Sequence, residues 1–98
     1  MARVAGRLNH SIPAKSRIDL TMWFSMEEGD LITFNCTYTN ASASVDFGFI
    51  APDGLFYYVN STSGSINQTI EVTQTGQYML AIRNNASYAV TVTGTVKY

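Results

Sequence analysis

The segment VTQTGQYMLAIRNNASYAVTVTG, residues 72–94, decides the fold class because apolar and polar residues alternate along both of its halves. One parity holds Tyr78, Leu80, Ile82, Tyr88, Val90 and Val92. A period of two places alternate side chains on opposite faces of a strand. The segment therefore predicts two half-buried strands, which we expect to form a β-hairpin closed by Asn84 and Asn85.

The same alternation recurs upstream, in residues 18–26, 31–39, 45–50, 55–59 and 65–72. Turn signals separate these runs, and the two clearest are EEGD at 27–30 and APDG at 51–54. In the second of these, proline sets φ and glycine accepts a positive φ. We expect residues 18–26 and 31–39 to pair as a hairpin and APDG to turn the next one.

These runs predict an all-β protein, an antiparallel β-sandwich that is jelly-roll-like and has seven to eight strands. The length suits one domain over residues 1–98, with an N-terminal strand or arm at 1–17 and the core sandwich at 18–98. The parity predicts a core of Ile32, Phe34, Phe47, Phe49, Ile70, Tyr78, Leu80, Ile82, Val90 and Val92. Gly94 lies on the apolar parity and predicts a bulge or a close approach of two backbones.

Charged residues make up 13% of the chain, about half of the roughly 25% usual in globular proteins, and the net charge is −1. Nine Ser, eleven Thr and seven Asn supply the polar surface instead, as on many extracellular β-domains. There is no basic stripe for a phosphate backbone, so nucleic acid is not an expected partner. No apolar run is long enough for a membrane span or a signal peptide. We expect a secreted or cell-surface protein whose signal peptide is absent from this chain.

Three turn motifs carry a family resemblance. Gly29 and Asp30 open one strand, Pro52-Asp53-Gly54 turns a hairpin, and Gly76-x-Tyr78 begins a late strand. In this order and spacing the sequence resembles the bacterial pre-peptidase C-terminal domain, a jelly-roll-like β-sandwich, over most of its length. It is less closely similar to the Golgi-dynamics (GOLD) domain, in which the Gly-x-Tyr strand ends in Arg-Asn, as it does at Arg83 and Asn84.

The resemblance implies a non-catalytic accessory or binding module of a bacterial secreted or surface protein. Such a module supports stability, export or attachment, and its partner is a protein or a polysaccharide. The alternatives are a GOLD-like adaptor for protein interaction, a carbohydrate-binding module and a fragment of a hydrolase.

Catalysis is not expected from this sequence. A nucleophile needs a nearby base, and the one histidine, His10, lies in a polar stretch that predicts a solvated side chain. Cys36 is the only cysteine and shares the apolar parity of its strand, which predicts a buried thiol and excludes an internal disulfide. Glu27 and Glu28 are adjacent on a turn and would point apart, so a carboxylate pair is not expected either.

Calcium is the one cofactor for which the sequence offers ligands. Oxygen ligands could come from Glu27, Glu28, Asp30 and Asp53, all of which lie in predicted loops. The alternative is that these carboxylates keep the turns solvated and discourage strand pairing at an edge. We expect no cofactor, and no contribution of calcium to folding.

Trp23 and Tyr57 are the candidate binding residues. Trp23 breaks the inward parity of residues 18–26 and is expected to face outward, where Tyr57 could join it. Exposed aromatic side chains stack on ligands or anchor interfaces. The alternative is that the N-terminal residues 3–9 pair alongside and bury the indole.

Overall fold

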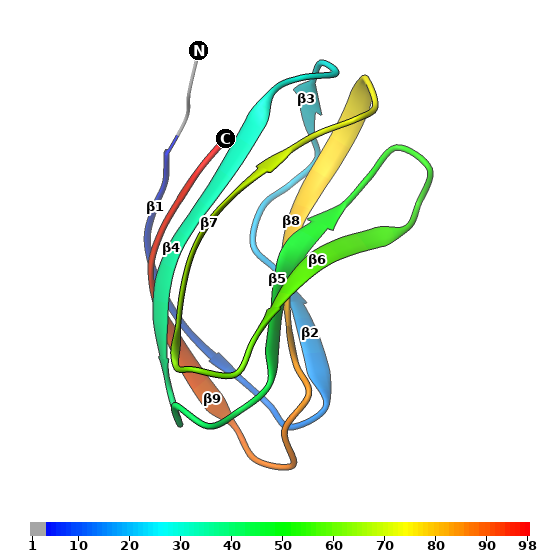
Figure 1. The fold of residues 1–98 in the computed structure, drawn as a ribbon. Helices are drawn as coiled ribbons and strands as arrows, with labels where there is room; N and C mark the ends of the chain where they lie inside the picture. Colours follow the sequence, from blue (N-terminus) through cyan, green and yellow to red (C-terminus); the bar gives the residue numbers. More distant parts are fainter. Residues whose placement is uncertain (1–3) are drawn as a thin grey trace.

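A computed structural model describes residues 4–98, with side chains from Leu8 onward, and these residues form an all-β fold (Figure 1). The strands are β1 (Val4–Ile12), β2 (Ser16–Asp19), β3 (Phe24–Met26), β4 (Leu31–Thr39), β5 (Val45–Ile50), β6 (Phe56–Ser61), β7 (Ser65–Glu71), β8 (Gly76–Asn84) and β9 (Val90–Lys97). Within this described part, no helix has the length and apolar character needed to cross a membrane.

The strands form two antiparallel sheets, which Figure 1 shows lying face to face. The first sheet has the order β1-β9-β4-β7, and the second has the order β2-β8-β5-β6, with β3 also paired to β8. This arrangement confirms the predicted antiparallel sandwich.

The core lies between the sheets and contains the residues that the alternation predicts. Nine of the ten predicted core residues are buried, and Ile70 is half-buried on the edge strand β7. The rings of Phe34 and Phe47 meet edge to face across the two sheets, with centroids 6.0 Å apart. Tyr88 was predicted to face inward but is 38% exposed, because it lies in the loop before β9.

Two of the predicted hairpins are wrong. β8 and β9 lie in different sheets, with β8 paired to β2, β3 and β5, and β9 paired to β1 and β4. Likewise the predicted pair at 18–26 and 31–39 is divided between the sheets, since β2 and β3 pair with β8 in the second sheet and β4 lies in the first. The expected hairpin at APDG is confirmed, since β5 and β6 pair directly. Two consecutive strands bury alternate residues whether they pair in one sheet or lie in opposite sheets of the sandwich. Alternation alone therefore does not distinguish a hairpin from a connection that crosses between the sheets.

The predicted strand at residues 18–26 is broken into β2 and β3, which raises the number of strands in the described region to nine. Both halves pair with β8, but between them the Thr21 hydroxyl accepts the hydrogen bond from the Leu80 N–H at 3.1 Å. The Thr21 hydroxyl thus accepts a hydrogen bond that a backbone carbonyl accepts in regular strand pairing. Regular pairing with β8 is interrupted at this point. As a result Met22, which shares the inward parity of Ile18 and Leu20 in the sequence, is 86% exposed.

Gly94 confirms the predicted close approach of two backbones. Its φ is +138°, and a Cβ at this position would lie 2.3 Å from the carbonyl oxygen of Asn35 on β4. Only glycine therefore lets β9 lie this close to β4.

Cys36 is buried on β4, and burial raises the pKa of its thiol to about 11. Because the thiolate is the reactive form, we expect iodoacetamide at pH 8 to alkylate Cys36 about 100-fold more slowly in the folded chain than in urea. Mass spectrometry of quenched samples measures both rates. Equal rates would contradict a buried, protonated thiol.

Candidate binding groove

A groove of about 580 Å³ lies beside Trp23 at the end of the second sheet. It is lined by Trp23, Ala51, Pro52, Gly54 and Gln77. None of these five residues carries a charge, and the polar side-chain groups are the Gln77 carboxamide and the Trp23 indole N–H. The groove thus combines an aromatic wall, small apolar residues and one group that can both donate and accept hydrogen bonds.

The β5–β6 turn builds one wall of the groove. The Gly54 N–H donates to the Ala51 carbonyl at 2.9 Å, and Gly54 adopts a φ of +83°, which favours glycine. Gly76 at the start of β8 leaves room for this turn, since a Cβ there would lie 2.8 Å from Cγ of Pro52. The Pro52-Asp53-Gly54 and Gly76-x-Tyr78 motifs, which are far apart in sequence, therefore meet at this groove.

Trp23 is 51% exposed, as the sequence predicts, although the reason differs. It lies in the break between β2 and β3 and not within a continuous strand. The alternative that the N-terminal residues bury it is wrong for the described residues, because β1 pairs with β9 at the edge of the other sheet. Next to the indole, Gln77 is fixed by a hydrogen bond of 2.5 Å from its Nε2 to the Ser25 Oγ.

Tyr57 does not line the groove, so the structure does not bring the two candidate binding residues together there. Its ring stacks on Phe49, and its hydroxyl donates to Asp53 Oδ2 at 2.5 Å. This hydrogen bond and the one from the Leu55 N–H lower the pKa of Asp53. The same contact with Asp53 raises the pKa of Tyr57. Tyr57, which is 40% exposed, thus helps to fix the β5–β6 turn that carries Pro52 and Gly54.

The four calcium candidates are not gathered into one site. Asp30 Oδ2 accepts the Glu27 N–H at 2.9 Å and so closes its own turn, whereas the Glu28 N–H donates to Thr75. Asp53 accepts hydrogen bonds from its own turn and from Gln74. Among residues 4–98, no group of three or more His, Cys, Asp and Glu side chains is placed to hold a metal ion. His10 lies on β1 and is exposed.

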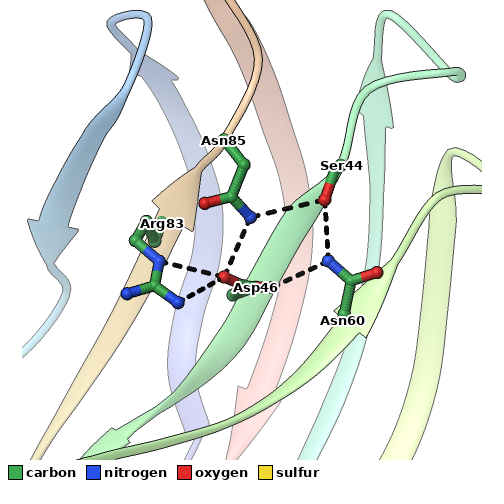
Figure 2. Close-up of polar contacts among 5 residues, drawn as sticks. All are labelled: Ser44, Asp46, Asn60, Arg83 and Asn85. Atoms are coloured by element: carbon green, nitrogen blue, oxygen red, sulfur yellow. Dashed lines mark hydrogen bonds and ion pairs between the residues drawn. The ribbon is translucent and has the colours of Figure 1, made fainter.

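Sequence reasoning missed a polar network on the outer face of the second sheet (Figure 2). Asp46 on β5 is only 2% exposed, and four N–H groups donate to its carboxylate. Arg83 donates from Nε and Nη2 to Oδ2 at 2.9 and 2.7 Å, Asn85 donates to the same oxygen, and Asn60 donates to Oδ1. Ser44 Oγ accepts from Asn60 at 2.8 Å. The available signal was one acidic residue inside the apolar run VDFGFI.

This network holds the Arg83 side chain against two aromatic rings of β6. The guanidinium carbon lies 5.1 Å from the ring centroid of Phe56 and 4.8 Å from that of Tyr58. The hydrogen bonds with Asp46 raise the pKa of Arg83 above its ordinary value. The network ties β5, β6 and β8 together on the side of the sheet that faces away from the core.

Comparisons with known proteins support the fold and do not indicate a function. No family model matches the chain, and no curated protein matches it. The VP2 subviral particle of infectious bursal disease virus is similar over 99% of this chain, with a TM-score of 0.59 and 16% identity. The Yersinia pseudotuberculosis-derived mitogen is similar over 99% of this chain and 85% of its own, with a TM-score of 0.58 and 11% identity. This chain spans only 31% of the viral chain. At these identities the likeness shows a shared β-sandwich fold.

Proposed function

We propose that this chain is a non-catalytic binding module of a bacterial secreted or surface protein, and that its Trp23 groove holds an uncharged polysaccharide. The observation that carries the proposal is the half-exposed indole in a groove whose five lining residues are all uncharged. Trp23 and its neighbour Met22, which is 86% exposed, together present apolar surface to water, and a contact role is a reason to keep that surface exposed.

The chemistry of the groove suits a sugar ring. The flat face of an indole packs against the apolar C–H face of a pyranose, while the exposed Pro52 adds an apolar contact. The Gln77 carboxamide can donate to one hydroxyl and accept from another. A charged ligand would find no partner of opposite sign among the lining residues.

The accessory role and the export of the protein rest on the sequence. The low charge and the high content of Ser, Thr and Asn favour an extracellular surface, and the order of the three turn motifs resembles the pre-peptidase C-terminal domain. The GOLD-like adaptor is the second candidate, because the Gly-x-Tyr strand ends in Arg83 and Asn84 as in that family. In that case the groove would hold an apolar side chain of a protein.

Replacing Trp23 by alanine should abolish retention on polysaccharide while the fold persists. Because the indole is about half exposed, we expect the free energy of unfolding to fall by about 1–2 kcal/mol, against the 3–5 kcal/mol typical of a buried aromatic residue. Co-sedimentation with insoluble cellulose, chitin and peptidoglycan sacculi, and migration through xylan gels, measure the binding. We expect at least one of these matrices to retain the natural chain at least about tenfold better than the variant.

Tyr88→Ala is the matched control, since Tyr88 is also an exposed aromatic but lies in the loop before β9. It should leave retention unchanged. Failure of every matrix to retain the natural chain, or equal retention of the Trp23 variant, would contradict the proposal. Capture of a protein partner that depends on Trp23 would favour the adaptor.

A further inference from the structure

Strand β6 is the free edge of the second sheet. The sheet order places it last, beyond β5, and β5 is its only ladder partner among the described residues. Figure 1 shows β6 along the outer margin of this sheet. An edge strand presents backbone N–H and C=O groups that can pair with another chain, so natural proteins usually protect such edges with charges, proline or bulges.

The other edges carry protection of this kind. β1 has a register shift between Val4 and Arg7, which interrupts the regular pairing of that edge strand. β2 and β3 have only four and three residues, and β2 carries Arg17 and Asp19. β7 ends in Glu71, which places a charge at the end of that edge.

β6 has none of these devices. Its sequence, FYYVNS, contains no charge, no proline and no glycine, and three of its six residues are aromatic. Tyr57 and Tyr58 are 40% and 49% exposed, and Leu55 just before the strand is 60% exposed. A short uncharged segment with a high preference for strands, exposed on an edge, is the typical template for strand pairing.

The side chains of β6 are also fixed in advance. Phe56 and Tyr58 stack with centroids 5.2 Å apart, and the Arg83 guanidinium lies over both rings. Asp46 pairs with that guanidinium. Pairing at this edge therefore orders few additional side chains, and the cation that lies over its rings already has a partner.

We propose that β6 pairs antiparallel with β6 of a second copy of this chain, about a two-fold axis normal to the sheet. A second copy fits because an uncharged strand can lie against itself without placing like charges opposite each other. Opposite residues of antiparallel strands share a face, so a register centred on Tyr58 places this tyrosine opposite its counterpart in the second copy. The same register pairs Tyr57 with Val59, an aromatic and β-branched combination that is favourable across strands.

The test is the association state of the chain with Tyr58→Glu. A glutamate at this position can pair with Arg83 in the monomer, whereas in the dimer two glutamates would stand opposite each other. Sedimentation velocity up to about 0.5 mM should show a dimer for the natural chain and at least tenfold weaker association for the variant. Circular dichroism verifies that both chains are folded.

Thr69→Glu is the matched control, because it places the same charge at an exposed position of the β7 edge. It should leave the dimer intact. A natural chain that stays monomeric at about 0.5 mM, or a dimer that survives Tyr58→Glu, would overturn the proposal. So would a dimer that only Thr69→Glu disrupts, because the pairing edge would then be β7. These outcomes do not depend on the Trp23 groove.

Discussion

Replacing Gly48 by alanine is expected to lower the free energy of unfolding by about 4 kcal/mol, the largest loss that we expect from adding a single methyl group. Gly48 lies in the middle of β5, opposite Tyr58 of β6. A Cβ at this position would lie 1.8 Å from the carbonyl oxygen of Tyr57 and 2.7 Å from Cα of Tyr58. Both atoms belong to the backbone, so the two strands must separate and the β5–β6 ladder must weaken. Urea unfolding followed by Trp23 fluorescence measures the loss.

Gly29→Ala separates this steric effect from the ordinary cost of losing a glycine. Gly29 has a φ of +95°, but a Cβ there would meet nothing within 4 Å. Its replacement should cost only about 1–2 kcal/mol of conformational strain. If Gly48→Ala cost no more than Gly29→Ala, the close contact between β5 and β6 would be wrong.

Replacing Asp46 by alanine is expected to cost about 3 kcal/mol. The change removes the carboxylate that accepts hydrogen bonds from four N–H groups. The donors of Arg83, Asn60 and Asn85 then lose this partner. The Arg83 side chain is 38% exposed, so water can solvate part of the guanidinium and limit the loss. Urea unfolding of the variant against the natural chain measures the difference.

Asp19→Ala provides the comparison, because Asp19 also pairs with an arginine on the same sheet. The distance from Arg17 Nε to Asp19 Oδ1 is 3.5 Å, and both side chains are more than 40% exposed. An exposed ion pair contributes about 0–1 kcal/mol, so this variant should stay close to the natural chain. Similar losses for the two aspartates would contradict the structural role of the Asp46 network.

The fold class and most of the core could be predicted because a two-residue period reports which face of a strand is buried. Strand pairing could not be predicted from the same signal. β8 and β9 have the alternation of a hairpin, yet the loop at 85–89 carries the chain from one sheet to the other. The buried side chain of Asn84 helps to hold this crossing, since its Nδ2 donates to the carbonyls of Ile12 and Tyr88. Such long-range contacts leave no periodic trace in the sequence.

The groove could be predicted only in pieces. Proline and glycine at 52–54 and glycine at 76 predict turns from local chemistry, but their meeting beside Trp23 depends on the packing of two sheets. The exposure of Trp23 followed from an assumed continuous strand, whereas the structure places it in a break that Thr21 creates. The Asp46 network could not be predicted because its members come from three segments that are distant in sequence, around the start of β5, on β6 and at the end of β8.

A ¹H–¹⁵N NMR titration of the folded chain with cellohexaose and with hexameric N-acetylglucosamine tests most directly whether the Trp23 groove holds an uncharged sugar chain. Binding there should shift the signals of the Trp23 indole N–H, the Gly54 backbone N–H and the Gln77 side-chain amide, and should leave those of β9 in place. Absence of any shift with either oligosaccharide would contradict the proposed function. Shifts confined to β9, for example at Thr93 and Thr95, would contradict the proposed site.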